Sequence, residues 1–326
     1  MSPRTSAVLL LTLLAALSTL GCAVEASSSP GLQLIDVSDP TRPALLCDLE
    51  TPGGAADVAI GDALLCVADT TRGLQVVDLS EPARPRILGS VDTPGGAAAV
   101  ALAGELAFVA DTTSGLQLID LSDPDRPTRV GAVDTPGGSV DVAVSGFHAF
   151  VADTTSGLQV VDVSNPAQPK LVGALDTPGG AVGVAVSGRL ACVADTTSGL
   201  QVIDVSDPAN PVLLGSVDTP GGATGVALLG TLACVADTTF GLQVIDVADP
   251  ARPALLGSID TPGGATSVAV SGELAFVADT MAGLQVVDLS DPVHPVLLAT
   301  FDRWSSAESV HVAGTVAAVS HGEILP

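Results

Sequence analysis

The sequence predicts an all-β fold, a seven-bladed β-propeller built from four-stranded repeats of about 42 residues. The first observation is a Gly-Leu-Gln triplet that recurs at one fixed spacing, starting at Gly31, Gly73, Gly115, Gly157, Gly199, Gly241 and Gly283. The second is that apolar runs of strand length alternate with turns rich in Gly and Pro. The third is that this period matches the size of a propeller blade.

One repeat, residues 141–182, illustrates the four expected strands, termed A to D in chain order. They cover residues 142–144, 148–152, 158–163 and 170–175. Prolines after strand C prevent that strand from continuing, and glycines allow backbone angles that other residues resist. Strands B and C are apolar on both faces, which indicates a sheet packed between two other sheets. Strand A carries small alanines, which suit the crowded axis of a propeller.

The two ends of the chain predict how the ring closes. Residues 31–50 contain only strands C and D of a repeat, and residues 309–320 match only strands A and B. We therefore expect the seventh blade to combine strands from both ends, within one propeller domain at residues 31–326. A linear solenoid would instead need polar capping repeats, whereas closure removes exposed sheet edges.

Residues 1–22 resemble a secretory signal peptide. Residues 7–17 form an apolar stretch that is too short to cross a membrane comfortably. The Thr-Leu-Gly-Cys that ends at Cys22 resembles a bacterial lipobox, although Thr19 and Leu20 depart from the usual residues. This resemblance implies lipid attachment at Cys22, with residues 23–30 as a polar tether. The expected location is the outer membrane or cell surface, with plain secretion as the alternative.

Composition narrows the class of partner. The chain is 47% hydrophobic with a formal net charge of −25, and it contains six Phe, one Trp and no Tyr. It is too apolar to be disordered. Its negative charge repels phosphate backbones, so a nucleic acid is not expected as a partner. Cationic partners or ions are favoured instead.

The repeats resemble a known family. The segments GLQVVDVSNP, GLQVIDVSDP and GLQLIDLSDP, each followed by LLGSVDTPGG or a close variant, resemble the LVIVD repeat. The resemblance covers nearly all of residues 31–326. It implies a β-propeller on a bacterial or archaeal cell surface, and it carries no assigned reaction. Gly and Ala stand here where that family often has Tyr.

Acidic residues recur at two places on one expected face of the propeller. The loop after strand B begins with Asp69, Asp111, Asp153, Asp195, Asp237 and Asp279. The junction between repeats carries Glu50, Asp92, Asp134, Asp176, Asp218, Asp260 and Asp302. The loop aspartates are weak candidates for calcium ligands. The favoured interpretation is that each carboxylate caps a turn by accepting backbone N–H groups, because such a residue is needed in every blade.

Other reactive side chains form no recognisable catalytic or metal motif. Cys66, Cys192 and Cys234 occupy a position that Phe fills in other repeats, so they are expected in the core. No spacing predicts a disulfide partner for Cys47. The chain lacks G-x-S-x-G, H-E-x-x-H and phosphate-loop motifs, which argues against an enzyme.

The last junction, residues 301–308, breaks the repeat and contains the sole tryptophan. Arg303, Trp304 and His321 are therefore the candidate partner-binding residues, since Trp and Arg dominate binding hot spots. The alternative is that Trp304 only fills the gap where the ring closes.

The sequence as a whole favours an exported, lipid-anchored and non-enzymatic binding or scaffolding module of the cell envelope. Its partner would be a protein or glycan of the envelope, and it would need no cofactor. The alternatives are a propeller enzyme acting on an extracellular glycan or other substrate, and an adhesin stabilised by Ca²⁺.

Overall fold

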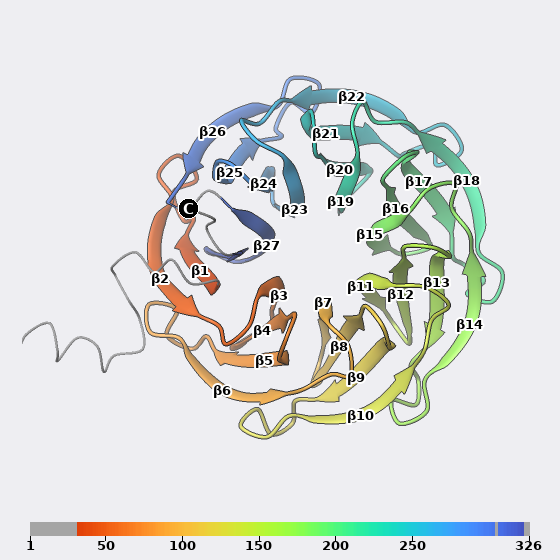
Figure 1. Ribbon diagram of the computed structural model, residues 1–326. Helices are drawn as coiled ribbons and strands as arrows, with labels where there is room; N and C mark the ends of the chain where they lie inside the picture. Colours follow the sequence, from red (N-terminus) through yellow and green to blue (C-terminus); the bar gives the residue numbers. More distant parts are fainter. Residues whose placement is uncertain (1–30, 304–305, 323–326) are drawn as a thin grey trace, which may run out of the picture.

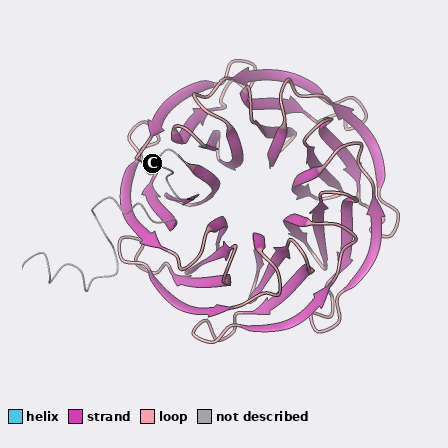
Figure 2. Cartoon of the chain, viewed as in Figure 1, coloured by secondary structure: helices cyan, strands magenta, loops and turns pink. Residues whose placement is uncertain are grey.

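The protein is a closed ring of strands around a central channel (Figure 1). The computed structural model describes residues 31–303 and 306–322, and all regular elements in these ranges are strands (Figure 2). No helix in this part of the chain could cross a membrane. Seven four-stranded sheets surround the channel, which confirms the predicted seven-bladed propeller.

Strands at the same place in each blade form four concentric sets. The innermost strands, A, are β3 (Ala55–Ile60), β7 (Ala97–Ala103), β11 (Ser139–Ser145), β15 (Ala181–Ser187), β19 (Ala223–Leu229), β23 (Ala265–Ser271) and β27 (Ala307–Ala313). The B strands are β4 (Leu64–Asp69), β8 (Leu106–Asp111), β12 (His148–Asp153), β16 (Leu190–Asp195), β20 (Leu232–Asp237), β24 (Leu274–Asp279) and β28 (Val316–His321).

The outer half of each blade holds the other two sets. The C strands are β1 (Gly31–Asp36), β5 (Gly73–Asp78), β9 (Gly115–Asp120), β13 (Gly157–Asp162), β17 (Gly199–Asp204), β21 (Gly241–Asp246) and β25 (Gly283–Asp288). The outermost strands, D, are β2 (Ala44–Glu50), β6 (Arg86–Val91), β10 (Thr128–Val133), β14 (Lys170–Leu175), β18 (Val212–Val217), β22 (Ala254–Ile259) and β26 (Val296–Phe301). We number blades 1 to 6 from β3–β6 to β23–β26, and blade 7 is the remaining sheet.

Blade 7 closes the ring as the two ends of the chain predicted. Its strand order is β2-β1-β28-β27, so the last two strands complete the first two. β1 and β28 pair antiparallel without a register shift, from Gly31 opposite His321 to Asp36 opposite Val316. Figure 1 shows the red and dark blue ends of the described chain meeting in this sheet.

The strand bounds differ from the prediction mainly in strand A. In blade 3 it begins at Ser139 rather than residue 142, and strand C runs from Gly157 to Asp162 rather than over 158–163. The pairing of β11 with β12 shifts register between Ser139 and Asp141. This bulge adds a residue on one strand only, which a count of alternating side chains does not detect.

The hydrophobic core lies between blades rather than within one sheet. Each cluster joins residues of two neighbouring blades; for example, Phe150 and Leu158 of blade 3 pack with Val184 and Ile203 of blade 4. Phe276 of blade 6 packs in the same way with residues of blade 7. Because each sheet buries both faces, the strands are apolar on both sides, as predicted.

The glycine of the Gly-Leu-Gln triplet is required by the backbone. Gly157 has a φ of 67°, a left-handed conformation that other residues resist. A Cβ at this position would lie 2.3 Å from the carbonyl oxygen of Leu175 in the neighbouring strand. The triplet therefore marks the tight entry from the B–C loop into strand C.

Candidate functional site

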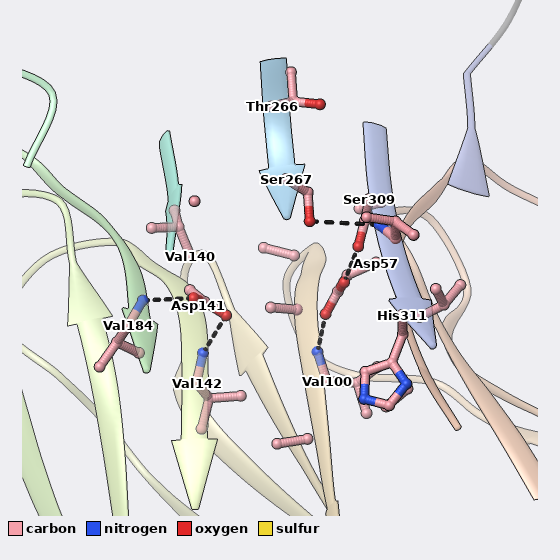
Figure 3. A pocket seen from close by; sticks show the side chains of 18 of the residues that line it. Asp57, Val100, Val140, Asp141, Val142, Val184, Thr266, Ser267, Ser309 and His311 are labelled. Atoms are coloured by element: carbon pink, nitrogen blue, oxygen red, sulfur yellow. Dashed lines mark hydrogen bonds between the residues drawn. The ribbon is translucent and has the colours of Figure 1, made fainter. Parts of the chain in front are cut away.

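The central channel forms a cavity of about 420 Å³ on the axis of the ring. The innermost strands β3, β7, β11, β15, β19, β23 and β27 supply its wall. Most of the wall is Val and Ala, with Ile60 and Leu102 adding larger apolar groups. Polar side chains interrupt it on only some of the blades, as Figure 3 shows.

One position of the inner strand differs from blade to blade. In chain order from blade 1 to blade 7 its occupants are Asp57, Ala99, Asp141, Gly183, Gly225, Ser267 and Ser309. The following position is Val in all seven blades, and the one after that is Ala in six blades and His311 in blade 7. The sequence analysis missed this variation because it compared the residues that recur. Aligning strand A of all seven repeats would have found it.

The polar groups of this position tie neighbouring blades together. The Val100 N–H of blade 2 donates to Oδ2 of Asp57 at 2.9 Å, and the Ser309 hydroxyl of blade 7 donates to Oδ1. The Val184 N–H of blade 4 donates to Oδ2 of Asp141 at 2.7 Å. The N–H of Val142, which follows Asp141 in the chain, donates to Oδ1 at 2.8 Å. Figure 3 shows both carboxylates in these contacts.

The environment of the channel disfavours charge on both carboxylates. Removal from bulk water inside the ring and, to a smaller extent, the nearby charge of Asp57 together raise the pKa of Asp141 to about 7. Burial also raises the pKa of Asp57, against hydrogen bonds from Ser309 and Val100 that favour its charged form. Burial lowers the pKa of His311, although the charge of Asp57 opposes this shift.

Asp141 should make folding stability depend on pH. An acid with a raised pKa in the folded state keeps its proton there between about pH 4, its unfolded value, and about pH 7. Its contribution to stability is therefore largest below pH 4 and is lost as the pH rises towards 7. We expect Asp141→Asn to remove this loss. The melting temperature of the variant minus that of wild type should therefore be about 3 °C higher at pH 8 than at pH 5.

Asp162→Asn is the matched control for this measurement, because it removes one carboxylate from the same blade. Hydrogen bonds from Ser164 lower the pKa of Asp162, so that the residue is charged in both folded and unfolded states above pH 5. The difference between this variant and wild type should stay constant over the same range. A constant difference for Asp141→Asn would contradict the raised pKa.

The six loop aspartates cap turns, as the favoured interpretation held. Asp195 is fully buried, and its Oδ1 accepts the N–H groups of Thr197 at 3.2 Å and Ser198 at 3.1 Å. Its Oδ2 accepts the Gly179 N–H at 2.8 Å from the junction that precedes the blade. The same Oδ2 contact to a junction glycine recurs for Asp69, Asp111, Asp153, Asp237 and Asp279.

This burial corrects the expected acidic face. The loop aspartates lie inside the ring of turns, and only the junction carboxylates such as Asp92 and Asp134 are exposed. Within residues 31–303 and 306–322, no group of three or more His, Cys, Asp or Glu side chains could hold a metal ion. The oxygens of the loop aspartates accept hydrogen bonds from backbone N–H groups, which favours the turn-capping role over calcium binding.

The structure describes two of the three candidate partner-binding residues and places them differently. Arg303 is exposed on the segment after β26, whereas Trp304 lies outside the described residues. His321 is only 2% exposed, so the expectation that it lies on the surface is wrong. Its Nε2 is 3.4 Å from Oδ1 of the buried Asp48 in β2. His321 therefore belongs to the closure of blade 7 rather than to a binding surface.

The cysteines are structural in the described part of the chain. Cys66, Cys192 and Cys234 are free and fully buried, as predicted. Burial raises the pKa of each of these thiols to about 12, which makes them poor nucleophiles. Cys47, for which no spacing predicted a partner, is buried in β2.

The fold and its repeat define the class of protein, a seven-bladed β-propeller with a central channel. The chain belongs to the LVIVD repeat family. The repeat matches residues 26–51, 52–93, 94–135, 136–177, 178–219, 220–261 and 262–303. The first match contains only strands C and D, and the closing strands β27 and β28 follow the last one.

Two solved structures share this fold at low sequence identity. One is the computationally designed Ika8 protein, with 12% identity and a TM-score of 0.66, over 86% of this chain and 84% of that one. The other is the β-propeller domain of Cps50 (Swd1) from Myceliophteria thermophila, with 14% identity and a TM-score of 0.65, over 83% and 97%. These likenesses concern the fold alone. No curated protein matched the chain.

Proposed function

We propose that this protein is an exported, lipid-anchored module of the cell envelope that binds a partner without catalysing a reaction. The observation that carries the proposal is a repeated apolar rim on the outermost strands. Leu171, Leu213, Leu255 and Leu297 occupy the same place in four consecutive blades. Each is 38–44% exposed, and Val212 and Val296 beside them are each 54% exposed. A rim of this kind suits a protein partner that makes repeated contacts.

The N-terminal segment supports the proposed address. Its apolar stretch and the Thr-Leu-Gly-Cys at Cys22 resemble those of a lipid-anchored precursor. Gly31 is the first residue of β1 and pairs with His321, the last residue of β28. An anchor at Cys22 would therefore hold the B–C loop face of the propeller near the membrane, within reach of an eight-residue tether.

Labelling cells with a fatty-acid analogue tests the anchor. We expect wild type to take up the label and to partition into the membrane fraction, and Cys22→Ser to lose both properties. Cys66→Ser, which removes a buried thiol of the core, should keep the label. Absence of label on wild type, or recovery of Cys22 in a disulfide, would contradict the proposal.

Capture from envelope extracts tests the partner surface. Leu213→Ser with Leu255→Ser should reduce capture if the rim is the contact, and Trp304→Ala should reduce it if the last junction is the hot spot. Phe147→Ser is the control, because Phe147 is 70% exposed in the A–B turn of blade 3, away from the rim. Each variant must melt like wild type before its loss of capture is assigned to contact rather than folding.

A propeller enzyme is the alternative function, and the channel is the observation that favours it. Asp57, Asp141 and His311 place different polar groups on different blades, which is the arrangement expected of a catalytic site on this fold. However, both carboxylates accept hydrogen bonds from the backbone of the next blade, which supports a holding role rather than proton transfer. Hydrolysis of a panel of envelope glycans that is lost in Asp141→Asn would establish the enzyme instead.

A further inference from the structure

We propose that the central channel binds a small organic cation, a primary amine or diamine, whose ammonium groups contact the carboxylates of Asp57 and Asp141. The site lies on the axis of the ring. It is separate from the apolar rim, and Arg303 does not line it. The inference therefore does not depend on the lipid anchor or on an envelope partner.

The first argument is that no cationic side chain of the described residues pairs with the negative charge of the channel. No lysine or arginine lines the cavity in the described part of the chain, and burial favours the neutral form of His311. Carboxylates removed from bulk water are normally paired with a cation or take up a proton. The chain's net charge of −25 adds to the attraction of the channel for a cation.

The second argument is that the carboxylates occupy a position that the fold does not require to be acidic. Blades 2, 4 and 5 have Ala99, Gly183 and Gly225 there and still form complete sheets in the ring. Ser267 and Ser309 fill the same position on blades 6 and 7, and the Ser309 hydroxyl orients Asp57. Residues needed for the fold recur in every blade, whereas this position carries acidic groups on one side of the channel only.

The third argument concerns the kind of cation. An ionised carboxylate has about four acceptor positions, and the protein uses two of them on Asp141, so positions remain for an ammonium group. Both aspartates are partly exposed to the lumen and can be reached from it. The rest of the wall is mostly Val and Ala, interrupted by the hydroxyls of Thr224, Thr266, Ser267 and Ser309 and by the ring of His311. This largely apolar wall suits a short alkyl chain better than a hydrated metal ion.

Calorimetric titration of the purified full-length protein tests the site. The probe is 1,4-diaminobutane, and the titration is made at pH 8 in about 0.15 M salt, which screens the charges of the outer surface. We expect saturable binding to one site. Asp141→Asn and Asp57→Asn should each weaken the affinity by at least about tenfold, because losing a charge contact shielded from bulk water costs more than about 1.4 kcal/mol, the free energy of a tenfold change in affinity. Butylamine should bind more weakly, and 1,4-butanediol should not bind.

Two further measurements separate the channel from the acidic exterior. Asp162→Asn removes an equal charge from blade 3 outside the cavity and should leave the affinity unchanged. The affinity should fall at least tenfold from pH 8 to pH 5.5, because protonated carboxylates no longer attract the ammonium groups. The proposal would be overturned if Asp141→Asn and wild type bound the diamine with equal affinity. It would also be overturned if Na⁺ or Ca²⁺ gave the same heat of binding as the diamine, or if millimolar diamine did not bind. The melting temperature of each Asn variant, measured at pH 8, shows whether a loss of binding reflects unfolding.

Discussion

Deletion of residues 307–326 is expected to abolish the cooperative unfolding of the full ring, or to lower its melting temperature by more than about 20 °C. The deletion removes β27 and β28, and with them all six residue pairs between β1 and β28. β1 and β2 would remain as a two-stranded ribbon, which is at best marginally stable in water. The closing strands therefore hold the N-terminal strands in the ring.

The size of the effect follows from the packing on both sides of blade 7. Val310, Ala317 and Val319 pack against blade 6, and Ala318 packs towards blade 1. Without blade 7's closing strands, the apolar side chains that pack against them in both neighbouring blades become exposed to water. Each large side chain that is exposed lowers the free energy of unfolding by about 1.5–3 kcal/mol. Several such side chains together approach the 5–15 kcal/mol that stabilises a typical domain.

A circular permutant distinguishes ring closure from mere sensitivity to cutting. The linker Thr-Thr-Ser, copied from residues 154–156, would join residue 321 to Gly31. The substitution His321→Asp would give this new loop the capping aspartate that the other six blades have. New ends would lie between Ala209 and Asn210, in an exposed C–D loop of blade 4. All strand pairs are retained, so we expect this protein to melt within a few degrees of wild type. Thermal unfolding followed by circular dichroism measures both proteins. A truncated chain that melted like wild type would contradict the closure.

The ring could be predicted from the sequence because its determinants are local and repeated. Glycines such as Gly157 are needed wherever the chain enters strand C, and the two half-repeats at the ends have complementary strands. Each repeat supplies the same information again, so errors at one turn do not change the count of blades. The bulge at Asp141 was missed because it depends on the register between two strands.

The channel could not be predicted from the features that repeat. Both faces of the strands are apolar, so alternation of side chains does not reveal which residues of strand A face the axis. Asp57 and Asp141 therefore looked like isolated acidic residues until the ring placed them in one cavity. The place of His321 likewise depends on Asp48, which is 273 residues away in the chain.

The second large effect is expected for Asp195→Ala, which should lower the melting temperature by about 8 °C. This fully buried carboxylate accepts the N–H groups of Gly179, Thr197 and Ser198. Alanine leaves the first two without this acceptor, and leaves Ser198 with only its longer bond, of 3.3 Å, to the backbone carbonyl of residue 195. A hydrogen bond to a charged group contributes about 1.5–3 kcal/mol, and the combined loss is about 4 kcal/mol. For a chain of this size, that corresponds to roughly 2 °C for each kcal/mol.

Asp204→Ala in the same blade is the control for this prediction. Asp204 caps the next turn through the Ser206 N–H at 2.8 Å, but solvent can replace this contact because the turn is exposed. We expect a change of melting temperature of no more than about 2 °C, as for most surface substitutions. Asp195→Asn should fall between the two, because its one amide oxygen can serve only some of the three donors. Equal losses for Asp195→Ala and Asp204→Ala would mean that the six recurring aspartates do not hold the junctions. The rigidity of the ring would then come from the packing between blades alone.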